Sequence, residues 1–259
     1  MKKAVFLLAG LLMTAAIASA QTKSEIEKVD RVLKQMSPRA QKELVIQDKA
    51  AFVKDLKAVL EEEKKYPNSG DLPLYFLIDK KHYAPKGYEP KNLKKLTACT
   101  NYNISRSDLS LRPDVEANLQ IMGEAARKDG ITLLVSSTYR SYDYQAKLFQ
   151  RWVDIDGLEE AERESARPGT SQHQLGSAID FGSITNDFIN TSQGKWLYNN
   201  AWKYGWTLSF PQEYEDITGY RYECWHYRYV GIPAAQLQKK YFRNVQQYML
   251  EFIDLWKNM

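Results

Sequence analysis

The segment from Ser171 to Asp180 constrains the fold most, because it carries an aspartate into an apolar strand. It reads Ser-Gln-His-Gln-Leu-Gly-Ser-Ala-Ile-Asp, and residues 177–181 are typical of a strand. Burying a carboxylate there is costly unless it is paired or bound to a cation. The sequence therefore predicts a partner or a bound cation for Asp180, which follows the loop histidine His173 by seven residues.

A second histidine has a similar setting. His226 lies in an aromatic-rich strand with Glu223 just ahead of it. Two imidazoles and one carboxylate, with the fourth position left to water, would make an open zinc site suited to hydrolysis. The same three side chains could also form an ordinary hydrogen-bonded core, and their spacing alone leaves both possibilities open. The third histidine, His82, lies in a Pro-rich irregular segment and is assigned to structure or surface.

The surrounding pattern predicts an α+β domain with a small antiparallel sheet flanked by helices. Its clearest helix starts at Pro113 and stops at Gly130. Further helices are expected from 141 to 152, from 191 or 192 to 204, and from Pro233 to Phe252. Strands are expected at 74–78, 131–138, 177–181, 206–210 and 225–230.

The first twenty residues have the form of a cleaved secretory signal. Lys2 and Lys3 precede an apolar run from Ala4 to Ile17, which ends in Ala18-Ser19-Ala20. A retained membrane anchor is the alternative, but the run is about fourteen residues where a span needs about twenty. We expect an exported protein, periplasmic or extracellular, without stable membrane insertion.

Charge argues against nucleic acid as a partner. The whole chain has a formal net charge of +4, and loss of the signal with its two lysines brings the balance closer to neutral. The two cysteines, Cys99 and Cys224, are too few for a disulfide scaffold.

Residues 21–70 are expected to form a helical extension. Ser24 and Glu27 have capping-box spacing, Ser37-Pro38 restarts a helix, and a third stretch carries Phe52 and Leu56 on one face. The turn formers at 67–71 predict the boundary to a main domain over 71–259. The extension is expected to serve as a packing or spacing element. The alternative is that it docks a partner protein or the cell wall, which truncation near Leu72 would test.

Three blocks in order resemble the VanY-type D-alanyl-D-alanine carboxypeptidases, zinc enzymes related to lysostaphin-like and Hedgehog-type folds. They are Ser-Thr-Tyr-Arg-Ser-Tyr-Asp-Tyr-Gln at 137–145, the S-x-H-x-x-G-x-A-x-D block at 171–180, and Glu-Cys-Trp-His at 223–226. The resemblance covers about residues 74–232. It implies Zn²⁺ as cofactor and peptidoglycan stem peptides as substrate.

Carried over to these positions, the family pattern implies that His173, Asp180 and His226 bind zinc and that Glu223 is the general base toward a metal-activated water. Residues three apart point to opposite sides of a regular strand. Glu223 is therefore expected at a strand entrance or a turn, where it could reach the water without coordinating the metal.

Three further roles follow from the resemblance. Arg140, between a strand and a helix, corresponds to the family arginine that faces the scissile carbonyl and stabilises the oxyanion. Gln145 and Ser171 match positions that hold the substrate's peptide and terminal carboxylate. Independently of the resemblance, Arg167 just before the second block is either another carboxylate clamp or an exposed turn residue.

Position 224 departs from the family pattern, which has proline there. Cys224 could be an inert buried thiol, a disulfide partner of Cys99, or an unusual metal contact.

Together these features predict an exported zinc D,D-carboxypeptidase that removes the terminal D-alanine from peptidoglycan stem peptides. L,D-carboxypeptidase action on tetrapeptide stems is the alternative within the fold. A non-catalytic wall-binding module that keeps the zinc is the alternative from another class, although such a module has no need of Glu223 and Arg140.

Overall fold

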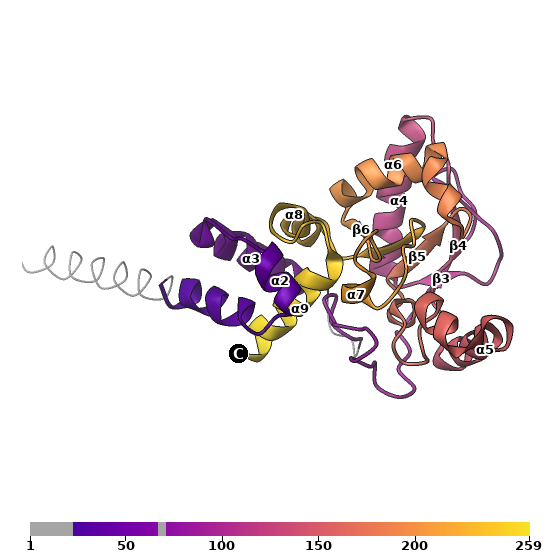
Figure 1. Cartoon of the computed structure of the whole chain (residues 1–259). Coiled ribbons are helices and arrows are strands. Elements are labelled where there is room, and N and C mark those ends of the chain that lie inside the picture. Colours follow the sequence, from indigo (N-terminus) through magenta and orange to yellow (C-terminus); the bar gives the residue numbers. More distant parts are fainter. Residues whose placement is uncertain (1–22, 67–70) are drawn as a thin grey trace, which may run out of the picture.

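The computed structural model describes residues 23–66 and 71–259 of the chain (Figure 1). The expected signal sequence and the turn cluster at 67–70 lie outside the described residues, so the division near residue 70 stays a prediction. Among the described helices, none is both long and apolar enough to cross a membrane.

The main sheet has five strands. In spatial order its strands are β2 (Tyr102–Ile104), β4 (Leu133–Ser137), β5 (Ala178–Phe181), β7 (His226–Tyr229) and β6 (Trp206–Leu208). Neighbours are antiparallel except β2 and β4, which run parallel. A parallel pair requires a crossover, and the helix α4 (Pro113–Lys128) lies between these two strands in the chain. The expected α+β class is confirmed, with one parallel edge pair added to the antiparallel sheet.

Most predicted elements are present with small shifts. The β1 (Lys94–Lys95) and β3 (Ser110–Leu111) strands form a separate two-stranded ribbon. The helix expected to end near 152 continues as α5 (Tyr142–Glu164), with a break at Gly157, where φ is +81°. Of the two caps that the sequence allowed, Thr191 and Ser192, the structure has Thr191, whose side chain accepts from the Gly194 amide at the start of α6 (Ser192–Asn200).

Two expected elements are wrong. Residues 74–78 are not assigned to a strand in the described chain; instead, the backbone carbonyls of Leu74 and Phe76 accept from the buried Arg228 guanidinium, both at 2.9 Å. The single terminal helix is two, α8 (Ile232–Tyr241) and α9 (Gln246–Asn258). Between them Arg243 and Asn244 adopt positive φ, which a helix cannot accommodate.

The remaining helices complete the described chain. Short ones are α7 (Glu215–Thr218) and the 3₁₀ turns η1 (Gln172–Leu175), η2 (Asn186–Asn190) and η3 (Ala201–Tyr204). Near the N-terminus, residues 23–33 are helical, followed by α2 (Pro38–Glu43) and α3 (Lys49–Glu63). Ser37 caps α2 as predicted, whereas Ser24 lies inside helical residues rather than at a cap.

The N-terminal helices pack against the C-terminal ones, as the indigo and yellow ribbons of Figure 1 show. The Phe52 ring of α3 meets Tyr241 of α8 at 4.9 Å and Phe252 of α9 at 5.1 Å, both edge to face. One hydrophobic core runs from these helices to the sheet. The extension therefore shares its interior with the end of the chain, in keeping with the expected packing role.

Candidate metal centre and active site

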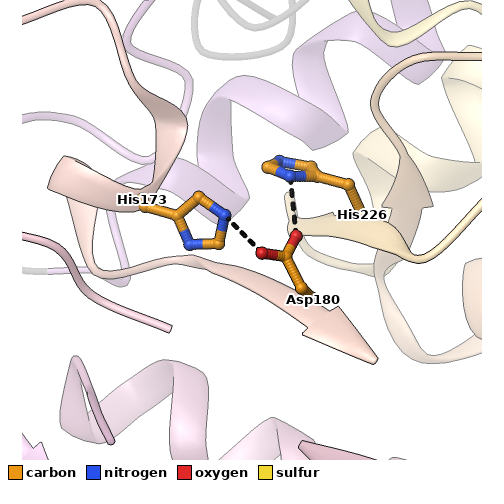
Figure 2. Close-up of side chains that lie close together, drawn as sticks. All are labelled: His173, Asp180 and His226. Atoms are coloured by element: carbon orange, nitrogen blue, oxygen red, sulfur yellow. Dashed lines mark ion pairs between the residues drawn. The ribbon is translucent and has the colours of Figure 1, made fainter. Parts of the chain in front are cut away.

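Strand register places the first two ligand candidates opposite each other. Asp180 of β5 pairs with His226 of β7, and on its other side with Ser137 of β4. His173 enters from η1, a turn that Gly176 closes in the left-handed conformation before β5 begins. Figure 2 shows both imidazoles pointing at the one carboxylate.

The three side chains converge on a small volume. His173 Nε2 lies 3.2 Å from Asp180 Oδ2, and His226 Nδ1 lies 3.0 Å from Asp180 Oδ1. The candidate ligand atoms all fall within 4.8 Å of one another, and each residue is at most 4% exposed. The resemblance named these three residues from positions far apart in the chain, and the fold brings them together.

The donor set fits a metal ion. His173 Nε2 and Asp180 Oδ1 are buried and find no hydrogen-bond partner in the described part of the chain. Polar atoms so deeply buried are normally satisfied. Two imidazole nitrogens and one carboxylate oxygen are ligands that zinc takes in open, three-ligand sites.

His173 is held as a neutral imidazole. Its Nδ1 donates to the Thr138 carbonyl at 2.7 Å, which leaves Nε2 with a free lone pair facing Asp180. Burial, reinforced by the nearby Arg140 cation, lowers the pKa of His173 to about 4. The imidazole is therefore uncharged at neutral pH, with its one proton on Nδ1.

Arg140 lies between β4 and α5, as the sequence predicted. Its Nη2 donates to Asp180 Oδ2 at 2.6 Å, and its Nε and Nη2 donate to Ser137 Oγ at 3.0 and 2.8 Å. Burial alone would raise the pKa of Asp180, but its surroundings, with the Arg140 guanidinium in direct contact, hold it well below its ordinary value. Asp180 is therefore an anion in its buried position.

Glu223 stands at the entrance of β7, outside regular strand geometry. Its amide donates to the Phe210 carbonyl at 3.1 Å, and its own carbonyl accepts from the His226 amide. Its Oε2 lies 3.5 Å from His226 Nδ1, so the carboxyl group borders the ligand cluster. Burial, together with the Asp180 charge, raises the pKa of Glu223 well above its ordinary value.

A cavity of about 290 Å³ opens onto this cluster, and its wall also includes Arg140, Ser171 and Glu223. Ser171 caps η1 by accepting from the His173 amide at 3.3 Å. Gln145 is not among the lining residues. It is fully buried, and its amide donates to the Ala166 carbonyl and to Ser165 Oγ, so it supports the loop that forms the wall.

Sequence reasoning missed several lining residues. Glu164 and Arg221 form an ion pair on the wall, and Trp152 of α5 and Gln247 of α9 also contribute. They come from segments outside the three sequence blocks, so only the fold could assign them to the cavity. Arg167 does not line this cavity; its guanidinium pairs with Glu162.

The cysteine alternatives are resolved by position. Both cysteines are free, with Cys99 exposed and Cys224 buried. Cys224 Sγ lies 3.6 Å from the Thr185 carbonyl and does not belong to the ligand cluster. Cys224 is therefore a buried thiol, neither a disulfide partner of Cys99 nor a metal contact.

The fold and the site define a peptidase-like protein with a candidate metal site, and comparison with known proteins supports this class. The family model "VanY: D-alanyl-D-alanine carboxypeptidase" matches residues 108–232. The putative carboxypeptidase YodJ of Bacillus subtilis is 38% identical over 167 residues, which are 62% of this chain and 61% of YodJ.

Two solved structures are also similar. The LdcB LD-carboxypeptidase matches with 34% identity and a TM-score of 0.61, over 69% of this chain and 84% of its own. A variant of the D,D-pentapeptidase VanY in complex with Zn(II) matches with 30% identity and a TM-score of 0.54, over 63% and 92%.

The chain belongs to the VanY family of D-alanyl-D-alanine carboxypeptidases. It spans 61% of the length of YodJ and 50% of that of the D-alanyl-D-alanine carboxypeptidase of Enterococcus faecium.

Proposed function

We propose that this protein is an exported zinc D,D-carboxypeptidase that removes the terminal D-alanine from peptidoglycan stem peptides. The observation that carries the proposal is the convergence of His173, Asp180 and His226 in a buried site beside Glu223, with a cavity alongside. Family membership and the zinc complex of a VanY relative support it. Export rests on the sequence of residues 1–20.

The three ligands would hold zinc, which when bound supplies Lewis-acid chemistry that polarises a carbonyl and makes water a stronger nucleophile. Glu223 would take the proton from the attacking water and deliver it to the leaving amine of D-alanine. The Glu223 carboxyl borders the ligand cluster, with its Oε2 3.5 Å from His226 Nδ1, which supports this role.

Arg140 would stabilise the negative charge that develops on the scissile carbonyl oxygen. Its guanidinium lines the cavity and is oriented by Ser137 and Asp180, so it needs little reorganisation during the reaction. Ser171, on the same wall, would donate to a substrate oxygen. Gln145 would act indirectly, by holding the loop at Ser165 and Ala166.

L,D-carboxypeptidase action on tetrapeptide stems is a second candidate, favoured by the similarity to the LdcB LD-carboxypeptidase. Both activities need the same ligands, base and arginine. They differ in the residue that precedes the terminal D-alanine, which the cavity wall at Glu164 and Arg221 could contact.

The test is digestion of purified muropeptides, with and without a chelator, followed by mass. Chelator-sensitive loss of one alanine from stems ending in D-Ala-D-Ala is expected. Loss only from stems ending in diaminopimelate-D-Ala or Lys-D-Ala would establish the L,D activity instead. Cleavage of neither, with zinc bound stoichiometrically, would favour a non-catalytic wall-binding module.

Substitution of the base separates catalysis from metal binding. Glu223→Gln is expected to abolish turnover while leaving zinc content nearly unchanged; loss of metal would make Glu223 a ligand. Glu124→Gln, which changes an exposed carboxylate on α4, is the matched control and is expected to retain full activity.

A further inference from the structure

We propose that Gln246, on the C-terminal helix α9, is a positioning residue that sets the protonation pattern of the ligand His226 through Gln172. The inference rests on the proposed zinc site. The family model matches residues 108–232, and Gln246 lies outside that range.

A buried chain of amide hydrogen bonds joins the two residues. Gln246 Nε2 donates to Thr207 Oγ1 at 2.7 Å and to the Thr207 carbonyl at 3.3 Å. Gln172 Nε2 donates to Gln246 Oε1 at 3.1 Å, and Gln172 Oε1 lies 3.3 Å from His226 Nε2. Ser209 Oγ donates to Gln172 Oε1 at 2.7 Å. These contacts lie in the protein interior, where Gln246 is fully buried and Gln172 is 6% exposed.

The polarity of this chain is set at one end by the backbone. The Thr207 carbonyl can only accept, so it faces the Nε2 side of the Gln246 amide and turns Oε1 toward Gln172. Gln172 must then donate with Nε2, which leaves its Oε1 facing His226. An amide oxygen also only accepts, so His226 carries its proton on Nε2.

The consequence falls on the opposite ring nitrogen. With the proton on Nε2, His226 Nδ1 has a free lone pair, and Nδ1 is the atom that faces Asp180 at 3.0 Å. His173 reaches the mirror-image state through a backbone carbonyl, that of Thr138, which accepts from its Nδ1. One ligand is thus oriented directly by the backbone and the other through two glutamine side chains.

Loss of Gln246 would release this constraint. Gln172 could then rotate its amide and present Nε2 to the imidazole, which favours the tautomer with a proton on Nδ1, where the metal binds. Partners that orient a histidine ligand typically change metal affinity by about 10- to 100-fold when they are removed. Because Gln246 acts through Gln172, we expect a value near the lower end, about tenfold.

The experiment measures zinc affinity of the metal-free full chain by competition with a chromophoric chelator, which requires no substrate. Gln246→Met is expected to raise the zinc dissociation constant about tenfold, and Gln172→Met by at least as much. The double variant is expected to be no weaker than Gln172→Met, since both act through one path. Gln246→Asn, which keeps an amide but shortens its reach, replaces Gln246→Met if that variant fails to fold.

A matched control separates orientation from a general loss of packing. Gln238→Met removes another fully buried glutamine, one whose Nε2 donates to the Asn244 carbonyl away from the site, and is expected to bind zinc as the parent does.

Equal zinc affinity for the parent and Gln246→Met would overturn the positioning role while leaving the zinc site intact. Equal weakening in Gln238→Met would overturn it too, because the effect would then be general. Failure of the parent chain to bind zinc would overturn the proposed metal site, and this inference with it.

Discussion

Asp180 and His226 are register partners on the adjacent strands β5 and β7, and their facing atoms lie 3.0 Å apart. The pairing matters because both residues are almost fully buried, where an aspartate needs a cation or hydrogen bonds. Arg140 supplies part of that compensation, and a bound metal ion would supply the rest. These partners offset the energetic cost of burying the Asp180 carboxylate in the sheet.

Arg140→Lys is expected to lower kcat for D-alanine release by about 100-fold or more. Lysine keeps the charge but cannot make the forked contacts to Ser137 and Asp180 that orient the guanidinium. Steady-state kinetics on the muropeptide that is cleaved measures the effect. Arg163→Lys, at an exposed ion pair on α5, is the control and should match the parent. Activity of Arg140→Lys within threefold of the parent would contradict the assigned role.

Gly182→Ala is expected to destabilise the protein by about 2–4 kcal/mol, because β5 ends there with no room for a side chain. An added Cβ would lie 2.1 Å from Phe188 Cε2, and φ is +60°. Gly130→Ala is the matched control, with φ at +77° but nothing within 4 Å of the added atom, and should cost only about 1 kcal/mol. Urea unfolding measures both; equal losses would show that the Phe188 contact carries no cost.

Phe52→Ala is expected to lower the free energy of unfolding by about 3–5 kcal/mol, since its ring fills the core between α3, α8 and α9. A chain starting at Leu72 exposes the same face of α8 and α9. The protein truncated at Leu72 is therefore expected to aggregate or to unfold at a lower temperature than the parent. Light scattering and thermal melts measure these two effects. A truncated chain as stable as the parent would make the extension dispensable for folding.

Glu116 of α4 should make stability depend on acid pH. Burial alone would raise its pKa, but hydrogen bonds from Lys94, Gln120 and Tyr102 lower it below the ordinary 4.5. A carboxyl with a depressed folded-state pKa stabilises above its unfolded pKa and loses that contribution as pH falls through the folded one.

Glu116→Gln should therefore lower the free energy of unfolding by about 1–3 kcal/mol at pH 7. The difference from the parent should shrink as pH drops below 4.5. Urea unfolding at pH 7 and at pH 3.5 measures it, with the exposed Glu124→Gln as reference. A gap that stays constant with pH would contradict the prediction.

Local sequence signals predicted many of the helices and strands of this protein. Helix α4 follows from Pro113 and the stop at Gly130, and the Thr191 cap of α6 follows from its side-chain chemistry. The ligand residues were named from short blocks whose residue types match a metal site, and the strand register then brought them together. Side-chain chemistry and local spacing are readable in one dimension, which is why the helix signals were predictive. The assignment of the three residues as metal ligands stays a prediction.

Other features depended on tertiary contacts. Residues 74–78 have a strand-like composition, but their backbone carbonyls accept hydrogen bonds from Arg228. The single helix expected at the end of the chain is interrupted at Arg243 and Asn244. Gln145 has a plausible substrate-binding position but is enclosed behind the cavity wall. Local propensity is weak beside burial and packing, so such elements are decided only when the chain closes.

The amino-acid sequence by itself determined most helix and strand positions, because residue type and periodicity carry that information locally. The candidate ligands came from the resemblance of three short blocks to a known family. Only the tertiary structure joined Gln246 to Gln172 and His226, and placed Glu164 and Arg221 on the cavity wall. These contacts link segments far apart in the chain, and their geometry exists only after the sheet and helices have packed.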